Sequence, residues 1–315
     1  MEKLISIIIP MYNEEKNIAA CLSSLLVQSS HNFHAIFVDD GSSDKTLLVL
    51  EDVLTDTDTP FSYTILTQEN GGAASAREMA LHHCNTPYVI SLDADDRYSE
   101  DMIQELETTI AHYAPDIVMP DMIHQDNHGN SFKFEFYSEE QDLVGIDCLE
   151  NSLAGWKAHG CICIKTSIFI KSYADYYALN PQRLNYVNND EIITRLNFYN
   201  SASVRRCKGI YFYQYNAEST TNSVNPQRYL RCLNAIILDT LFQNISDPIT
   251  RNVQIELFNT IRNTRRHLKN NKNNLPNSKK WKGIIRYAIR YLLLKKGSLL
   301  TPKQKLRLLK YYISL

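Results

Sequence analysis

The sequence has few long hydrophobic runs, no paired cysteine motif and, in its last part, no acidic residue. Its uninterrupted apolar stretches are only a few residues long, whereas a membrane-spanning helix needs about 20. We therefore expect neither a secretory signal nor a spanning helix. The seven cysteines form no C-x-x-C pair and their number is odd. We expect buried, reduced thiols in a cytoplasmic protein, and no zinc site.

Acidic residues are absent from Leu257 to Leu315, where 16 Lys and Arg occur. The residues before Leu257 include 17 basic and 35 acidic side chains. The net charge of −2 is therefore the sum of a basic C-terminal segment and an acidic remainder. A chain of 315 residues with 44% hydrophobic content is long enough for one substantial core and an appendage. We expect a main domain over residues 1–220 and a basic helical region over residues 221–315.

Strand and helix signals alternate through the first 98 residues. The predicted strands are Leu4–Ile9, His34–Val38, Tyr63–Leu66 and Tyr88–Leu92, and the predicted helices are Glu14–Val27, Lys45–Leu54 and Ala73–His83. This alternation is typical of an α/β fold, a parallel sheet with helices on both faces, whose right-handed crossovers bring the strand-to-helix loops to one edge. The converging loops are PMYNEE (10–15), DDGSSD (39–44), QENGGAASAR (68–77) and DADD (93–96).

The pattern becomes less regular after Tyr98. We predict helices over Ser99–Tyr113, Ile146–Ala154 and Asp190–Tyr199, and extended segments over Asp116–Ile123, Phe132–Tyr137 and Gly209–Tyr215. From Pro226 the spacing is helical almost to the end, with a break at residues 270–278 that predicts an exposed loop.

Three carboxylates, Asp93, Asp95 and Asp96, follow the predicted strand Tyr88–Leu92 directly. Ligands of open α/β sheets bind beyond the carboxyl ends of the strands, so this cluster lies where a site is expected. Neighbouring carboxylates repel one another unless a cation compensates, and oxygen ligands suit Mg²⁺ or Mn²⁺. The alternative interpretation is that Asp95 and Asp96 are turn residues before a helix.

The other loops carry side chains that suit a nucleotide. Asp39 and Asp40 end a strand, where an acceptor can bind a uracil imide or ribose hydroxyls, and Tyr12 offers a ring beside a base. The small residues of NGGAASAR (70–77) allow close approach of the backbone to a ligand at a helix N-terminus, which favours negative charge. Arg77 is a permanent cation whose planar group can bind phosphate, or an ordinary ion-pair residue.

Together the four loops resemble the motifs of family 2 glycosyltransferases with the GT-A fold, similar to bacterial capsule, exopolysaccharide and wall-polymer transferases. The resemblance covers roughly Ile5 to Tyr98 and implies a nucleotide-binding half over residues 1–98 and an acceptor half over residues 99–220. It implies UDP-sugar binding and a metal ion, Mn²⁺ or Mg²⁺, held by Asp93 and Asp95. The expected donor-binding residues are Pro10, Tyr12, Glu14, Asp39, Asp40, Asn70, Gly71, Gly72, Arg77, Asp93 and Ala94. One departure is Glu78, which stands after Ala76-Arg77 where the family usually has Asn.

The resemblance also implies a downstream catalytic carboxylate, commonly in a Glu-Asp pair that opens a helix. The segment NNDEIITRLNFY at 188–199 has Asn189 in place of the Glu, so Asp190 is the expected base and Glu191 is the second candidate. Another interpretation is that Asp190 only caps the helix.

The implied reaction is inverting transfer of a hexose from a UDP-sugar to a hydroxyl of a saccharide or lipid-linked acceptor. Residues 211–223 are expected to close over the site, and residues 155–157 to lie near the acceptor. The rival hypothesis is a non-catalytic nucleotide-sugar-binding or scaffold protein.

The basic C-terminal segment 278–315 leaves two alternatives open. Trp281, Ile285 and Leu292 fall on one helical face and Lys282, Arg286 and Arg290 on another, and Thr301-Pro302 starts a second basic helix. This pattern suits an anionic membrane surface, which would place the protein at the inner face of the cell membrane. It equally suits a helix packed on the main domain. Nucleic acid is not an expected partner, because no recognition motif accompanies the charge.

Overall fold

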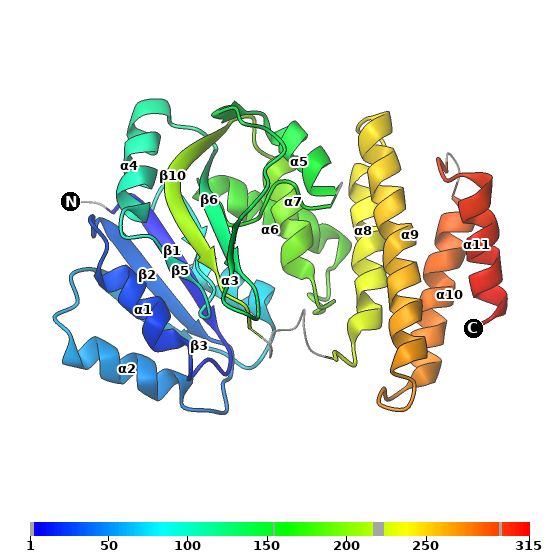
Figure 1. Ribbon diagram of the computed structural model, residues 1–315, viewed down its shortest axis with the longest axis horizontal. Helices are drawn as coiled ribbons and strands as arrows, with labels where there is room; N and C mark the ends of the chain where they lie inside the picture. The colour runs from blue at the N-terminus through cyan, green and yellow to red at the C-terminus, as the bar shows by residue number, and fades with distance from the viewer. Residues whose placement is uncertain (1–2, 154, 217–223, 296–297) are drawn as a thin grey trace.

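The computed structural model describes residues 3–153, 155–216, 224–295 and 298–315. A twisted mixed sheet lies between two layers of helices, and a bundle of helices packs beside it (Figure 1). The sheet has the strand order β3-β2-β1-β4-β9-β6-β10-β5, with β7 paired to β6 and β8 paired to β10.

The first four strands are parallel, as the alternation predicted. The elements of this half are β1 (Ile5–Met11), α1 (Ile18–Leu26), β2 (Phe33–Asp39), α2 (Thr46–Asp56), β3 (Ser62–Thr67), α3 (Ala73–Leu81) and β4 (Tyr88–Ser91). Each predicted strand and helix of this half is present, within a few residues of its expected bounds. The carboxyl ends of β1, β2, β3 and β4 therefore meet at one edge of the sheet.

The second half adds antiparallel pairs. Its elements are β5 (Arg97–Tyr98), α4 (Met102–Tyr113), β6 (Ile117–Gln125), β7 (Ser131–Lys133), β8 (Asp142–Leu143), α5 (Gly145–Leu153), β9 (Cys163–Lys165), α6 (Thr166–Leu179), α7 (Asn189–Tyr199) and β10 (Val204–Tyr213). Strand β9 runs antiparallel to both β4 and β6, and β10 runs parallel to β6. The sequence did not predict α6, although Phe169, Tyr173 and Tyr176 follow a helical spacing and are buried.

Alternate residues of β1 enter two different cores. Ile5, Ile7 and Ile9 pack with α1, α2 and α4 on one face of the sheet. Ile8 belongs to the core on the other face, which also contains residues of α3, α5, α6 and α7. A strand buried on both faces reads as a continuous apolar run, which explains the ISIIIPM sequence of β1.

In the C-terminal region, the described residues 224–295 and 298–315 form four helices, preceded by a short 3-10 turn, η1 (Arg228–Leu230). They are α8 (Arg231–Phe242), α9 (Asp247–Asn270), α10 (Ser278–Leu294) and α11 (Pro302–Ile313). Ser246 caps α9 and Thr301 caps α11, each with a proline in the first turn that follows. Leu238 and Phe242 of α8 and Val253 of α9 join the same core as α5, α6 and α7. This core thus runs across the expected boundary near residue 220.

The apolar face of α10 is buried inside the helical region. Trp281, Ile285 and Leu292 are fully buried against α8 and α9, and the Trp281 ring lies 5.7 Å from His267 and 5.1 Å from Tyr229. Protein and not lipid therefore covers this face, so Trp281 is not an interfacial side chain. The covering helices are α8 and α9 of the helical region, however, and not the main domain that the second alternative named. Among the described residues no helix is both long and apolar enough to cross a membrane.

Candidate active site

A polar cavity of about 760 Å³ opens beyond the carboxyl ends of β1, β2 and β4. Asp40, Asp93 and Asp95 all line it, and Asp190 joins them from the first turn of α7. Other predicted site residues in its wall are Pro10, Tyr12, Glu14, Asn70, Gly72, Arg77, Ala94 and Glu191. The sheet edge thus brings together side chains from the four predicted loops, as expected for an open α/β sheet.

Asp40 is almost fully buried, and its carboxylate holds the glycine loop in place. The backbone N–H of Gly71 donates to Oδ1 and that of Gly72 to Oδ2, each at 2.8 Å. The side chain of Gln68 donates a further 2.6 Å bond to Oδ1. Asp39 and Gly71 were predicted as donor-binding residues, but neither lines the cavity. Gly71 instead shapes it through its bond to Asp40.

The loop after β1 contributes an exposed ring and a perturbed carboxyl. Tyr12 lines the cavity with 49% of its surface exposed, so its ring is open to a flat ligand. Burial raises the pKa of Glu14 to about 7. A 2.6 Å hydrogen bond from Asn17 acts in the opposite direction, and the charges of Asp95 and Asp93 raise the pKa further. Glu14 therefore lies in an excess of negative charge.

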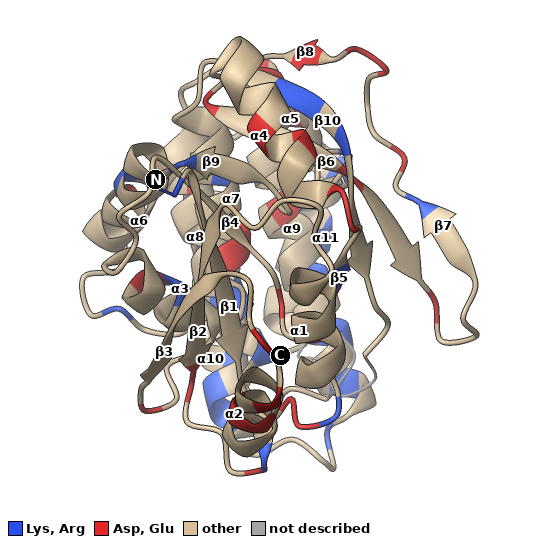
Figure 2. Ribbon diagram, turned by 90° about the vertical axis from the view of Figure 1, so that its left-hand side faces the viewer, with Lys and Arg blue, Asp and Glu red and all other residues tan. Residues whose placement is uncertain are grey.

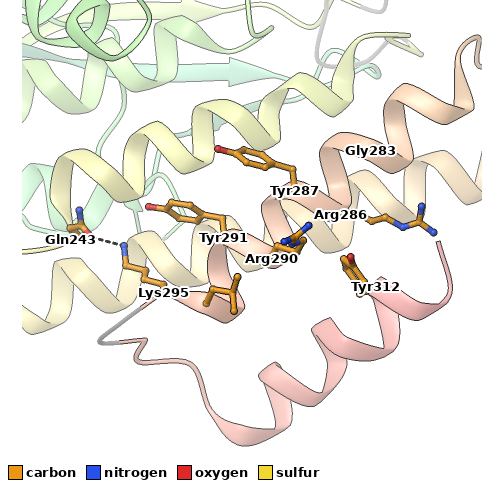
Figure 3. A pocket seen from close by; sticks show the side chains of 9 residues that line it. Gln243, Gly283, Arg286, Tyr287, Arg290, Tyr291, Lys295 and Tyr312 are labelled. Carbon is orange, nitrogen blue, oxygen red and sulfur yellow. Dashed lines mark hydrogen bonds between the residues drawn. The ribbon is translucent and has the colours of Figure 1, made fainter.

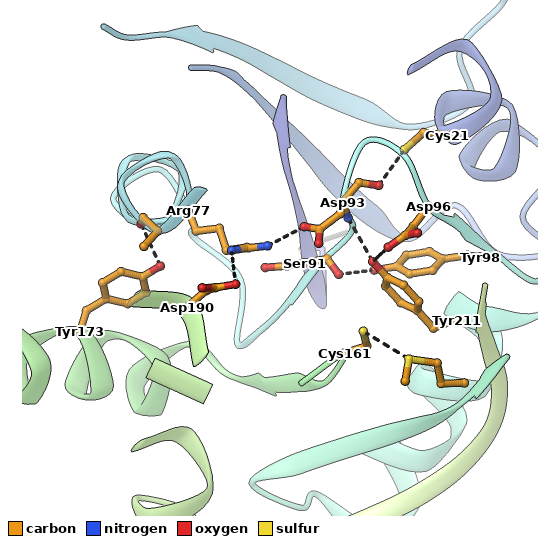
Figure 4. Close-up of polar contacts among 12 residues, drawn as sticks. Cys21, Arg77, Ser91, Asp93, Asp96, Tyr98, Cys161, Tyr173, Asp190 and Tyr211 are labelled. Atoms are coloured by element: carbon orange, nitrogen blue, oxygen red, sulfur yellow. Dashed lines mark hydrogen bonds and ion pairs between the residues drawn. The ribbon is translucent and has the colours of Figure 1, made fainter. Parts of the chain in front are cut away.

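Asp96 faces the protein interior and does not line the cavity (Figure 4). It accepts a 2.7 Å bond from the hydroxyl of Tyr211 and another of 2.7 Å from the backbone N–H of Gln214. Burial raises the pKa of Asp96 to about 8, and the charges of Asp93 and Asp95 contribute to the increase. Its bonds tie the loop after β4 to the end of β10.

Asp95 is the carboxylate of this loop best placed to hold a divalent cation. It lines the cavity and accepts a 2.9 Å bond from the side chain of Asn216. Burial raises its pKa, as does the charge of Asp93. Burial is the largest cause of the raised pKa values of Glu14, Asp95 and Asp96, and the neighbouring carboxylates add a repulsion that a cation would offset. Mg²⁺ is commonly held by one or two carboxylates together with substrate phosphates, and these residues fit that chemistry.

No group of three or more His, Cys, Asp or Glu side chains is arranged to hold a metal ion in the part of the chain that the structure describes. Asp93, predicted as the second ligand, carries a 2.5 Å ion pair with Arg77. Its role as a ligand stays a prediction.

Arg77 lies between two carboxylates from distant parts of the chain (Figure 4). Its side chain is 11% exposed; Nη2 contacts Asp93 Oδ1 at 2.5 Å and Nη1 lies 4.0 Å from Asp190 Oδ2. Burial acts to lower the pKa of Arg77, but the charges of Asp93 and Asp190 outweigh it and the pKa is raised. Arg77 therefore stays charged and fixes the position of the loop after β4 relative to α7.

The two adjacent acids of α7 have different surroundings. Glu191 forms an ion pair with Arg231, the first residue of α8, and lies 4.0 Å from Arg195. Asp190 has 49% of its side-chain surface accessible and lies 4.0 Å from Arg77. The surrounding protein displaces water from Asp190 and raises its pKa, while Arg77 acts to lower it. Glu191 is neutralised by its partner, whereas Asp190 faces open space.

The two departures from the family pattern have structural roles. Glu78 forms an ion pair with Arg183 in the segment before α7. Asn189 is buried; its Nδ2 donates to the backbone oxygen of Leu184 at 3.0 Å, and its Oδ1 accepts a 3.1 Å bond from Asn234 of α8. The amide of Asn189 thus joins α7 to α8, which a carboxylate would do less well because it lacks a donor.

A second cavity of about 560 Å³ adjoins the polar cavity at Asp190 and is mainly apolar. It shares Arg77, Asp93, Asp190 and Glu191 with the polar cavity. Its aromatic lining consists of His124, Phe134, Trp156, His159, Phe169, Tyr173, Tyr211 and Tyr213. The guanidinium of Arg195 lies 4.4 Å from the centre of the Trp156 ring. Trp156, which was predicted to lie near an acceptor, therefore lines the same cavity as Asp190, the candidate base.

Sequence reasoning missed several polar residues in the wall of the polar cavity. They include Asn13, Asn185, Asn188, Asn216, Asn225, Gln227 and Arg231. Single amides carry no spacing signature, and Arg231 lies within a helical pattern that gave no reason to connect it with the site. Residues 217–223, part of the segment expected to close over the site, are outside the described residues.

Residues 6–139 match the model of Glycosyl transferase family 2. This match places that part of the chain in glycosyltransferase family 2. Glycosyltransferase GlyG of Streptococcus pneumoniae serotype 4 is 31% identical over 163 residues, which are 50% of this chain and 52% of GlyG. The teichoic acid poly(glycerol phosphate) polymerase of Staphylococcus epidermidis is 41% identical over 96 residues, 30% of this chain and 13% of the polymerase. The chain spans about half of the first relative and less of the second.

Solved structures confirm the predicted GT-A fold of the family 2 domain. TarS 1–349 of S. aureus, in complex with UDP, superposes with a TM-score of 0.65 at 18% identity, covering 99% of this chain and 87% of that one. TarS 1–349 in complex with UDP-GlcNAc gives a TM-score of 0.60 at 17% identity, with 91% and 81% covered. The shared fold includes the C-terminal helices, because almost the whole chain is covered in the first comparison.

Proposed function

We propose that this protein transfers a hexose from a UDP-sugar to a hydroxyl of a saccharide or lipid-linked acceptor, with inversion, in the synthesis of a bacterial surface polymer. One observation carries the proposal. Asp190 lies on the wall common to a polar cavity lined by Asp40, Asp93 and Asp95 and an adjoining aromatic cavity. A transferase needs such an arrangement, with a base between its two substrates.

The polar cavity suits the donor. The Tyr12 ring is open to stack on a base, and the N-terminus of α3 beyond Gly72 favours the charge of a diphosphate. The names of the relatives and the UDP complexes of TarS support a nucleotide-sugar donor of this kind. Among the predicted donor contacts, Asp40 would act by holding the Gly71–Gly72 loop in place, because its oxygens already accept from that loop.

Asp190 is the proposed general base. The acceptor oxygen forms a bond to the anomeric carbon while the bond from that carbon to the diphosphate oxygen breaks, and the hydroxyl proton passes to Asp190. Glu191 is the weaker alternative, because its carboxylate is already engaged in an ion pair with Arg231. Arg77 is a positioning residue that orients Asp190 and Asp93.

The donor diphosphate needs charge neutralisation as it leaves. A Mg²⁺ or Mn²⁺ ion, held by Asp95 and by Asp93 beside it, would supply this Lewis acidity. Removal of divalent cations with EDTA should then weaken UDP binding, and Mn²⁺ or Mg²⁺ should restore it. Asp95→Asn should reduce the response to the ion, whereas Asp96→Asn should act mainly on stability because Asp96 does not line the cavity.

The aromatic cavity suits the acceptor. Sugar rings present apolar faces that pack on aromatic side chains, and Trp156 and Tyr213 line this space together with Asp190. We also propose that the protein works in the cytoplasm at the inner face of the cell membrane, where a lipid-linked acceptor would be within reach.

A screen of UDP-sugars with Mn²⁺ or Mg²⁺ tests the reaction, with UDP release measured in the presence of oligosaccharide or lipid-linked acceptors. Asp190→Asn should lower turnover by about 10²- to 10⁴-fold and keep UDP binding. Glu191→Gln, the adjacent control, should retain much more turnover. A non-catalytic binding protein would bind UDP-sugars and release no UDP with any acceptor, and unchanged turnover of Asp190→Asn would exclude the proposed base.

A further inference from the structure

Helix α11 carries an exposed apolar stripe. Leu306, Leu309 and Ile313 are 54%, 48% and 82% exposed. They follow one another at i, i+3 and i+7, so they share one face of the helix. Leu308 is fully buried and anchors another face of α11 on the helices below it. The stripe therefore belongs to a helix that is already packed, and it points to the surroundings of the protein.

A basic groove borders α11 on the side of α9. It has a volume of about 590 Å³, and five cations line it: Arg262, Arg265, Arg266, Lys269 and Arg307. Arg265 is fixed above the Tyr311 ring, 4.7 Å from its centre. No acidic side chain lines the groove, and the sequence has none from Leu257 onward. Among the described residues, none of these five cations forms an ion pair with a carboxylate, whereas Asp239 and Glu256 of the same region pair with Lys295 and Arg195.

A second groove, of about 820 Å³, borders α11 on the side of α10 (Figure 3). Arg286 and Arg290 line it together with Tyr312 of α11. Tyr287 and Leu294, also in its wall, are 55% and 75% exposed. The apolar stripe of α11 is therefore flanked on both sides by cations, and basic residues gather around α10 in the lower part of Figure 2.

We propose that α11 and the two grooves form a docking surface for an anionic lipid bilayer. Leu306, Leu309 and Ile313 would insert between headgroups, and the arginines of the grooves would bind lipid phosphates. An exposed apolar stripe flanked by cations is the pattern of helices that lie in the membrane interface, and each cation near an anionic surface adds to binding. The inference rests on the proposed function, since a lipid-linked acceptor would be presented at such a surface.

This assignment gives the inserting residues to α11 alone, whereas the expectation over residues 278–315 also included the apolar face of α10. The sequence pattern had pointed to Trp281 and its neighbours, but the structure buries that face in the helical core. A second copy of the chain fits the surface less well, because a symmetric contact through α11 would bring the two sets of cations together. A nucleic acid would leave Ile313 and Leu309 exposed to water.

Sedimentation of the full-length protein with phosphatidylcholine vesicles that contain or lack phosphatidylglycerol tests the proposal. Binding should require phosphatidylglycerol and weaken as salt is raised. Combined Leu306→Gln, Leu309→Gln and Ile313→Gln should reduce vesicle binding at least about tenfold. The matched control, Leu48→Gln with Ile170→Gln, changes two side chains that are each 52% exposed in the main domain, and should leave binding unchanged.

The charge contribution is tested with Arg266→Gln, Lys269→Gln and Arg307→Gln, each expected to weaken binding about fivefold. Lys208→Gln, an exposed cation on β10, is the control. All these variants should keep UDP binding, so failure of the membrane proposal and failure of the transferase proposal remain distinguishable. Equal vesicle binding by the apolar variant would overturn the proposal. The proposal would also be overturned if the wild type did not bind vesicles, or if it bound RNA or polyphosphate in preference to them. A dimer that the three apolar substitutions dissociate, while vesicle binding is kept, would show that the stripe is an interface between two copies of the chain.

Discussion

Arg231, the first residue of α8, forms an ion pair with Glu191, the residue next to the proposed base. The C-terminal helices thereby contribute a charged side chain to the wall of the polar cavity. This contact compensates the charge of one of two adjacent carboxylates, while the proposed base, Asp190, keeps only the longer 4.0 Å contact with Arg77.

Arg231→Met should destabilise the protein. Glu191 is only 24% exposed and would lose its partner, which is expected to lower the free energy of unfolding by roughly 1 to 3 kcal/mol. Lys171→Met, which breaks an exposed pair with Asp175, is the control and should cost under about 1 kcal/mol. Urea unfolding measures both, and equal small losses would show that the Arg231 pair contributes no more than a surface pair.

Arg77→Met should shift the pH dependence of turnover. Arg77 acts to lower the pKa of Asp190, so its loss leaves that pKa higher. A base must be deprotonated to act, and the acidic limb of kcat/KM should therefore move to higher pH. Arg77→Lys keeps the charge and should move the limb less. Measurement of kcat/KM across the pH range for the wild type and both variants tests this prediction. If the acidic limb of Arg77→Met stays where it is in the wild type, Asp190 is not the titrating base.

Gly72→Ala should damage the donor loop. Gly72 has φ +87° and ψ 164°, a conformation that essentially only glycine adopts, and an added Cβ would lie 2.2 Å from Asn185 Nδ2. We expect a loss of roughly 1 to 3 kcal/mol in unfolding free energy together with weaker UDP binding. Gly283→Ala, within α10, meets no atom within 4 Å and should be neutral or stabilising. Calorimetric UDP titration and urea unfolding measure the two effects.

His159 should make stability depend on pH. It is buried, with Nε2 3.0 Å from the backbone oxygen of Pro120, and burial lowers its pKa from 6.5 to about 4. The unfolded state therefore binds more protons between these values, so stability is complete above pH 6.5 and falls as the pH drops towards about 4. The loss should total roughly 3 kcal/mol. His159→Gln should remove this slope in unfolding free energy, whereas the exposed His128→Gln should keep it.

Trp281→Ala tests the packing of α10. Trp281 is fully buried between His267 and Tyr229, so its loss should reduce the free energy of unfolding by about 3 to 5 kcal/mol. Tyr287→Ala, at a position 55% exposed on the same helix, should change it little. A small effect of Trp281→Ala in urea would mean that α10 does not depend on this core.

The first half of the fold could be predicted because its signals are local. An almost continuous apolar run such as Ile5–Ile9, interrupted by Ser6, has few alternatives to a buried strand, and aspartate follows the runs that end at Val38 and Leu92. The convergence of Asp40, Asp93 and Asp95 followed from the parallel topology alone. The base was placed by resemblance to the family, since a helix start such as Asn189-Asp190 does not by itself indicate catalysis.

The remaining features depend on contacts between distant parts of the chain. The apolar face of α10 looks the same whether lipid or protein covers it, so burial of Trp281 could not be read from its spacing. Helix α6 is rich in aromatic and β-branched residues, which obscured a helical spacing visible in Phe169, Tyr173 and Tyr176. The ion pair between Glu191 and Arg231 joins residues 40 positions apart, and no motif links them.

The core beneath α7 also contains Leu238, Phe242 and Val253 from α8 and α9. Recombination that replaced these helices with those of a relative would expose the underside of α7, which carries the proposed base, unless the new helices matched its shape. We therefore expect this region to be inherited with the sheet as one unit, so that changes of acceptor arise by substitution within it and not by exchange of a whole module.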